Sequence, residues 1–264
     1  MDKDLEHHYE HLAADYDANW ARRQEYVDWM EEQIQRRLSL APGRPLADIG
    51  AGTGLFLQRL MERYAAPDRP ITCVDPSQAM LDRLPDDPRL RPLRATAEEL
   101  ASGAVRLPGD APLGGLLIKE AVHHFADLGR TLTGLAGLLA PGGRIVIVTL
   151  PPKIGYPLFQ SALDRFAERQ PEPAALAGIL QEAGLTTTVD HGAYPVRLDR
   201  DEWMRLVQGR WMSVLSSFPD AELAAGVQEI GERYPAGELE FSDTFAFVVA
   251  TREEWPHGGA PVAG

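Results

Sequence analysis

The chain has 264 residues, of which 44% are apolar and 25% charged, so it can form one large hydrophobic core and does not resemble a disordered protein. Its 39 acidic and 26 basic side chains give a formal net charge of −13, which argues against nucleic acid as a partner. The single cysteine, Cys73, excludes a disulfide framework and a metal site built from several thiolates. No segment has the roughly 20 consecutive apolar residues that a membrane-spanning helix needs, so we expect a soluble, cytoplasmic protein without a membrane partner.

Residues 1–40 are expected to form an N-terminal helical cap. Val27, Met30, Ile34 and Leu38 recur at the spacing of one helical face. The prolines and glycine of residues 41–45 then end the helix before any strand begins.

Residues 41–150 alternate between short apolar runs and helical stretches. The runs LADIG, ITCVD, LRPLRAT, LGGLLIKE and GRIVIVTL are predicted strands, and the segments between them show helical spacing. Strands that are almost wholly apolar and alternate with helices are typical of a parallel sheet covered on both faces. The sequence therefore predicts a doubly wound α/β core in this region.

Residues 151–252 are expected to complete the sheet. A helix is predicted near 173–183, a strand near 185–196, then a longer helical stretch and a last strand, FSDTFAFVVAT. Within the helical stretch, apolar residues from Trp203 to Phe218 follow one helical stripe, which could pack on the core or form a substrate lid over about 198–238. Residues 253–264 have the composition of a frayed tail.

A glycine loop follows the first predicted strand. Asp48-Ile-Gly-Ala-Gly-Thr-Gly54 places glycines where the backbone must turn and approach a ligand, before a helix expected to begin near Leu55. The loop lacks the Gly-Lys-Ser/Thr of a P-loop, and Leu55 stands where a dinucleotide fingerprint has its third glycine. About twenty residues further on, Asp75 ends the next strand, where a carboxylate can accept hydrogen bonds from both hydroxyls of a ribose. This pattern favours a nucleoside ligand without a pyrophosphate.

The segment from Asp48 to Val148 resembles the class I S-adenosylmethionine-dependent methyltransferases. DIGAGTG matches their D/E-x-G-x-G-x-G motif, and VDPSQAML, RATAEEL, IKEAVHHF and LLAPGGRIVIV resemble the motifs that follow it, in the same order. The resemblance implies a seven-stranded Rossmann-like sheet of order 3-2-1-4-5-7-6 with strand 7 antiparallel. It also implies N-terminal helices and a helical lid between strands 6 and 7.

The same resemblance implies S-adenosyl-L-methionine as cofactor. Asp75 would bind the ribose, Pro76 and Met80 would lie near the adenine, and Ala97 would offer its backbone amide to it. Thr96 stands where the family usually has an acid. The expected cofactor-binding residues are Tyr16, Asp48, Gly50, Ala51, Gly52, Asp75, Pro76, Met80, Ala97, Glu98 and Lys119.

Methyl transfer requires that the protein hold donor and acceptor in line and exclude water. His123 and His124 follow the fourth strand and are the candidate catalytic residues, as a general base or as positioning groups. The expected substrate-binding residues are Tyr9, Trp20, His124 and Trp211. We expect no metal, because Lys119 and Glu120 do not reproduce the acidic cluster of magnesium-dependent catechol-type enzymes.

The leading hypothesis is methyl transfer to a small organic acceptor, aromatic or partly apolar, in specialised metabolism, by a monomer or a homodimer. One alternative is a methyltransferase acting on a peptide or a carboxylate, because an acidic groove could attract a basic chain. Another is a scaffold subunit that binds the cofactor without turnover. A nicotinamide-dependent oxidoreductase is the most distant alternative.

Overall fold

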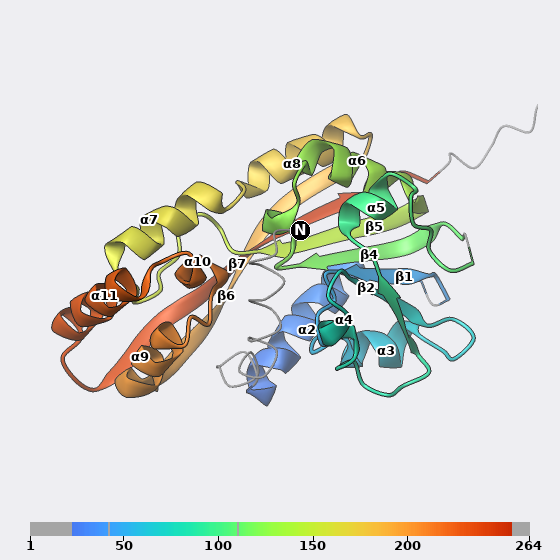
Figure 1. Cartoon of the computed structure of the whole chain (residues 1–264). Helices are drawn as coiled ribbons and strands as arrows, with labels where there is room; N and C mark the ends of the chain where they lie inside the picture. Colours follow the sequence, from blue (N-terminus) through green and yellow to red (C-terminus); the bar gives the residue numbers. More distant parts are fainter. Residues whose placement is uncertain (1–22, 42, 110, 255–264) are drawn as a thin grey trace, which may run out of the picture.

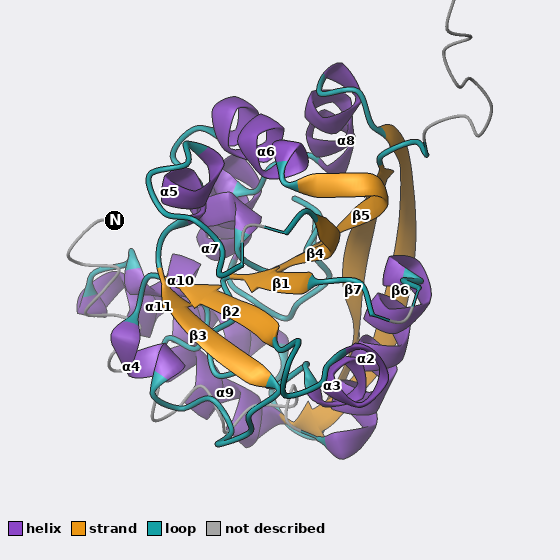
Figure 2. Ribbon diagram, turned by 90° about the vertical axis from the view of Figure 1, so that its right-hand side faces the viewer, coloured by secondary structure: helices purple, strands orange, loops and turns teal. Residues whose placement is uncertain are grey.

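The computed structural model describes residues 23–41, 43–109 and 111–254, and all structural statements concern these residues. They contain a seven-stranded sheet of order β3-β2-β1-β4-β5-β7-β6 (Figures 1 and 2). The strands are β1 (Leu46–Ile49), β2 (Ile71–Asp75), β3 (Leu90–Arg94), β4 (Leu113–Lys119), β5 (Leu139–Thr149), β6 (Thr186–Asp199) and β7 (Glu238–Thr251). The first five strands pair in parallel, and β7 runs antiparallel to β5 and β6. The predicted fold class is confirmed.

Helices cover both faces of the parallel sheet, as Figure 2 shows. One face carries α2 (Gln24–Leu38) and α3 (Gln58–Tyr64), and the other carries α5 (Ala97–Ala101), α6 (Leu128–Gly137) and α8 (Pro173–Glu182). A four-residue helix, α4 (Gln78–Leu81), follows β2, and a 3-10 turn, η3 (Val122–His124), follows β4. Every residue of β1 and β2 is buried, which is why these strands read as continuous apolar runs.

The predicted N-terminal helix is present as α2 and is fixed to the sheet by packing and by charge. Met30, Ile34 and Leu38 are fully buried against the sheet. The Arg37 guanidinium lies 3.7 Å above the Phe247 ring, and its Nη2 donates to Asp190 Oδ1 over 2.8 Å. The helix therefore bridges β7 and β6 on one face.

The β6/β7 hairpin extends beyond the rest of the sheet and supports a second group of helices (Figure 1). β5 pairs only with residues Ala246–Thr251 of β7, whereas β6 pairs with β7 along its whole length. The segment between the two strands contains α9 (Arg200–Gln208), α10 (Ser213–Ser216) and α11 (Asp220–Arg233). This is the helical insertion that was predicted between strands 6 and 7.

One detail of the prediction is wrong in this region. The apolar stripe from Trp203 to Phe218 is not one helix, because Arg210 adopts a left-handed φ of 57° between α9 and α10. Its guanidinium donates to the Leu215 and Phe218 carbonyls at 2.6 and 2.7 Å, so it holds the break together. Both short helices bury their apolar side chains in one cluster, which gave the appearance of a single stripe.

Two further differences concern helices near loops. The helix after the glycine loop begins at Gln58 rather than near Leu55, because a turn from Gly54 to Leu57 comes first. A helix that was not predicted, α7 (Gln160–Arg169), buries only Ala162 and Phe166, so its apolar pattern is sparse. No helix in the described part of the chain combines the length and the apolar character needed to cross a bilayer.

Candidate cofactor and active site

A cavity of about 710 Å³ opens at the carboxyl ends of the parallel strands. It lies where β1 is flanked by β2 on one side and β4 on the other, the position at which doubly wound sheets bind ligands. Its lining contains every expected cofactor residue that the structure describes: Asp48, Gly50, Ala51, Gly52, Asp75, Pro76, Met80, Ala97, Glu98 and Lys119. His123 and His124 line it as well.

The glycine loop lies against the end of β4 and leaves space toward the cavity. Gly50 and Gly52 have φ values of 73° and 54°, a region that side chains other than glycine enter at a cost. A Cβ atom on Gly50 would lie 2.5 Å from the Cβ of Ala121, whereas one on Gly52 would meet nothing within 4 Å. Gly50 therefore permits close packing of two loops, and Gly52 keeps part of the cavity wall free.

Asp75 ties the glycine loop to the end of β2. Its Oδ2 accepts from the Gly52 N–H and its Oδ1 from the Ser77 N–H, each over 2.9 Å. Burial raises the pKa of this carboxyl group, while the two N–H donors act to lower it. Each oxygen has a further lone pair, so the carboxylate can still accept from a ligand hydroxyl.

Asp48 and Lys119 are neighbouring charges at the back of the cavity. Asp48 is buried, and its Oδ1 has no hydrogen-bond partner within the described part of the chain. Burial raises the pKa of Asp48 to about 7, Lys119 opposes this shift, and the Asp75 charge adds to it. The Lys119 Nζ lies 4.2 Å above the Phe56 ring, and burial lowers the pKa of this amine.

The end of β4 places one carboxylate and two histidines on the cavity wall. Glu120 has a left-handed φ of 54°, its N–H donates to the Val148 carbonyl over 2.8 Å, and its Oε1 accepts from the Leu150 N–H over 3.2 Å. His123 and His124 form part of η3, and their ring centroids are 4.0 Å apart. Burial lowers the pKa of His123 to about 3, so this imidazole is neutral near pH 7 and a weak base.

The opposite end of the cavity is formed where β3 leads into α5. Thr96 caps α5, since its N–H donates to Glu99 Oε2 and its hydroxyl accepts from the Glu99 N–H. The Glu98 Oε1 accepts from the Ala126 N–H over 3.0 Å, which links α5 to the loop after η3. Thr96 thus supports the helix start at the position where the family usually has an acid.

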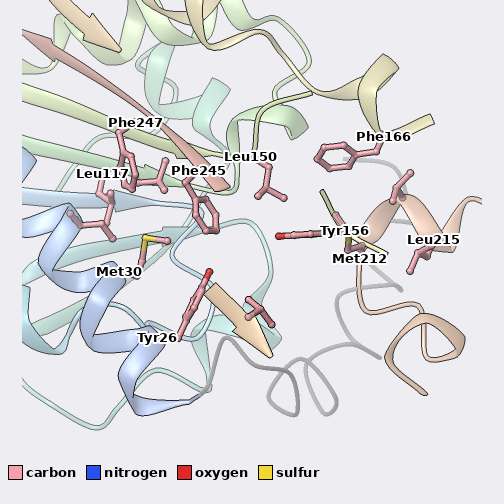
Figure 3. Packing of buried hydrophobic residues seen from close by; sticks show 14 of the residues in the cluster. Tyr26, Met30, Leu117, Leu150, Tyr156, Phe166, Met212, Leu215, Phe245 and Phe247 are labelled. Carbon is pink, nitrogen blue, oxygen red and sulfur yellow. The ribbon is translucent and has the colours of Figure 1, made fainter. Parts of the chain in front are cut away.

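A buried carboxylate that the sequence reading did not single out lies next to Lys119 and Glu120. Asp243 of β7 is 2% exposed, its Oδ2 accepts from the Tyr26 hydroxyl over 3.0 Å, and its Oδ1 accepts from the Tyr156 hydroxyl. Figure 3 shows the hydroxyl ends of both tyrosines directed into the space beside Phe245. The signal was available: in FSDTFAF, Asp243 occupies a position that strand alternation assigns to the buried face.

Of the expected substrate residues, His124 lines the cavity, and the other three lie elsewhere or outside the described residues. Tyr9 and Trp20 lie outside the described residues, as do the expected cofactor residue Tyr16 and most of the predicted tail. Trp211 does not line the described part of the cavity and packs against Tyr156 and Trp203 at centroid distances of 5.8 and 5.7 Å. Trp203 is fully buried and donates from its indole N–H to the Pro157 carbonyl, so it packs α9 against the segment that follows β5.

Comparison with known proteins agrees with this geometry. Residues 47–145 match the family described as methyltransferase domain. An uncharacterized methyltransferase of Mycobacterium tuberculosis is 33% identical over 135 residues, which cover 50% of this chain and 48% of that protein. The chain therefore matches about half the length of this curated relative.

Solved structures resemble a larger part of the chain. A protein of Anabaena variabilis described as a methyltransferase from an antibiotic biosynthesis pathway has a TM-score of 0.61 at 20% identity, and the match covers 85% of this chain and 97% of that one. A [4+2]-cyclase has a TM-score of 0.62 at 16% identity, over 95% of this chain and 96% of that one. These two similarities establish the fold and not the reaction. Residues 47–145 therefore match a methyltransferase domain, and the sheet has the strand order that the resemblance to class I S-adenosylmethionine-dependent methyltransferases implies.

Proposed function

We propose that the protein transfers a methyl group from S-adenosylmethionine to a small organic acceptor of aromatic or partly apolar character. The observation that carries this proposal is the cavity at the switch between β1 and β4 within the matched domain. There the glycine loop and Asp75 meet an Asp48 oxygen that no group in the described part of the chain pairs with. A cavity of this size is within the range of small-molecule sites.

The residues present suit this donor. Gly52 leaves open space where a backbone can approach a ligand closely, and Asp75 retains lone pairs for ribose hydroxyls. The buried Asp48 Oδ1 lacks a hydrogen-bond partner among the described residues, and an ammonium group can supply one. S-adenosylmethionine, when bound, supplies a methyl group attached to a positively charged sulfur.

The chain's own contribution is to position the reactants and exclude water. Phe56, Leu117 and Phe125 give the cavity apolar walls. An acceptor that must lose a proton would find three titratable side chains near the end of β4: Glu120, His123 and His124. His123 is a poor base because of its low pKa, which leaves Glu120 and His124.

Calorimetry and product analysis test the proposal together. S-adenosylhomocysteine should bind the purified protein, whereas NAD should not, and mass spectrometry should detect labelled methyl groups on members of a small-acceptor panel. Binding without transfer to any small molecule, peptide or carboxylate would favour the scaffold alternative. Transfer to basic peptides alone would favour a peptide methyltransferase, and absence of S-adenosylhomocysteine binding would refute the proposal.

A further inference from the structure

Glu120 is the one carboxylate of the described cavity lining whose backbone is strained. A left-handed φ is unfavourable for a residue other than glycine, so the surrounding structure must hold it in place. It is held by the hydrogen bond from its N–H to Val148 and by the one from the Leu150 N–H to Oε1. Both partners belong to β5 or directly follow it, so the neighbouring strand fixes the carboxylate.

The second carboxylate oxygen remains available to a ligand. In the described residues, Leu150 is the only hydrogen-bond donor to the Glu120 side chain, and no ion pair within 4 Å joins it to Lys119. The Lys119 ammonium instead lies over the Phe56 ring. Oε2 can therefore accept a hydrogen bond from a molecule in the cavity.

The other carboxylates of the lining are already engaged or lie elsewhere in the cavity. Asp75 accepts from two backbone N–H groups, and Glu98 accepts from the Ala126 N–H at the end near α5. Asp48 is at the base of the glycine loop on β1. Since β2 and β3 form the side expected for the nucleoside, Glu120 at the end of β4 is on the side left for the reacting groups.

The charge of the cavity indicates what this side accepts. The described lining has four carboxylates, Asp48, Asp75, Glu98 and Glu120, and a single cationic side chain, Lys119. With all four carboxylates ionised, the lining stays negative even when a donor with one net positive charge is bound. A cationic group is attracted to such a site and a carboxylate is repelled from it.

We propose, on the basis of the proposed function, that Glu120 binds the ammonium group of an amine acceptor and takes its proton. The ammonium N–H proton moves to Glu120 Oε2, and the nitrogen keeps the lone pair. That lone pair forms the new N–C bond while the C–S bond of the donor breaks, with its electrons left on sulfur. Burial, opposed in part by Lys119, raises the pKa of Glu120, and this brings the carboxylate closer to the basicity the step requires. His124 then helps to position the acceptor.

Glu120→Gln isolates this role, because glutamine keeps an oxygen that can accept from Leu150 and loses only the charge. The wild type should methylate primary amines such as 2-phenylethylamine at least tenfold faster than the matched alcohol, 2-phenylethanol. The variant should lose about 10²- to 10⁴-fold in kcat with the amine. Its Kd for S-adenosylhomocysteine should stay within twofold of the wild-type value, and its Kd for the amine in the presence of S-adenosylhomocysteine should rise.

The exposed Glu182→Gln on α8 is a matched control and should behave as wild type. If Glu120→Gln does not fold, Glu120→Asp tests the same point, because it keeps the charge and shortens the reach. Turnover of the variant within threefold of wild type would overturn the inference. A loss of S-adenosylhomocysteine affinity as large as the loss of kcat would overturn it too. Methyl transfer by the wild type to the alcohol alone would do the same. Failure of the wild type to bind S-adenosylhomocysteine would instead refute the proposed function.

Discussion

Asp243→Asn should destabilise the protein, because it changes a buried carboxylate that receives two tyrosine hydroxyls. Tyr26 lies on α2 and Tyr156 in the segment after β5 (Figure 3). Their hydroxyls both donate to Asp243, which therefore joins the N-terminal helix and this segment to β7. The pKa of Tyr156 is raised well above its ordinary value by burial and by the Asp243 charge, so its hydroxyl stays protonated and donates. Hydrogen bonds to charged groups contribute about 1.5–3 kcal/mol each.

Asparagine retains one oxygen for one tyrosine and places an NH₂ group opposite the other. One charge-assisted bond becomes neutral and the second is lost, so the free energy of unfolding should fall by about 1.5–3 kcal/mol. Urea unfolding followed by circular dichroism, with an unchanged m-value, measures this loss. Glu240→Gln is the control on the same strand: its ion pair with Arg197 is exposed, and its loss should cost less than about 0.5 kcal/mol. If the two variants lose equal stability, the buried hydroxyls do not contribute as argued.

Three further predictions concern the cavity. Asp75→Ala should weaken S-adenosylhomocysteine binding by about 1.5–3 kcal/mol in calorimetry, because the carboxylate anchors the Gly52 N–H and is predicted to bind the ribose. An unchanged Kd in a folded variant would contradict this. Gly52→Val should remain folded and lose binding, since its side chain enters open space. Gly50→Val should lose more thermal stability, because its Cβ overlaps Ala121. The reverse order of thermal stability would refute this assignment. Asp48→Asn should be more stable than wild type by roughly 1–4 kcal/mol at pH 8 and by little at pH 4. The pKa of Asp48 is raised from 3.8 to about 7, so the native state binds more protons than the unfolded state and loses stability as pH rises through this range. Equal gains in urea titrations at both pH values would rule this prediction out.

The sequence predicted the parallel core because each of its signals is local. The glycine loop must adopt positive φ values, and this restricts the residue types that fit at Gly50 and Gly52. The strands are buried on both faces, which makes them apolar throughout. The strand ends then fix where Asp48 and Asp75 lie, since the carboxyl ends of parallel strands share one edge.

The other half of the site depends on contacts between distant parts of the chain. Asp243 lies 217 positions from Tyr26 and 87 from Tyr156, and no short-range pattern connects them. The break between α9 and α10 depends on Arg210 reaching two carbonyls beyond it, while the apolar spacing on both sides continues as if the helix were unbroken. Trp211 was expected at the substrate because aromatic residues suit a shielded pocket, but the same property suits it to packing against Tyr156 and Trp203.

The electrostatics of the cavity connect these observations to function. Asp48 and Glu120 both have a raised pKa because burial disfavours their charge, and neither is within 4 Å of a cation among the described residues. Such groups lower the stability of the free protein, since neutral side chains of the same shape would avoid the cost of burying charge. That cost is offset once a positively charged ligand occupies the cavity, because each carboxylate then has an opposite charge nearby. The buried carboxylates destabilise the empty site, and a cation in the cavity compensates them. Such a site is suited to bind a sulfonium donor. It is also suited to release the product, whose sulfur carries no charge once the methyl group has left.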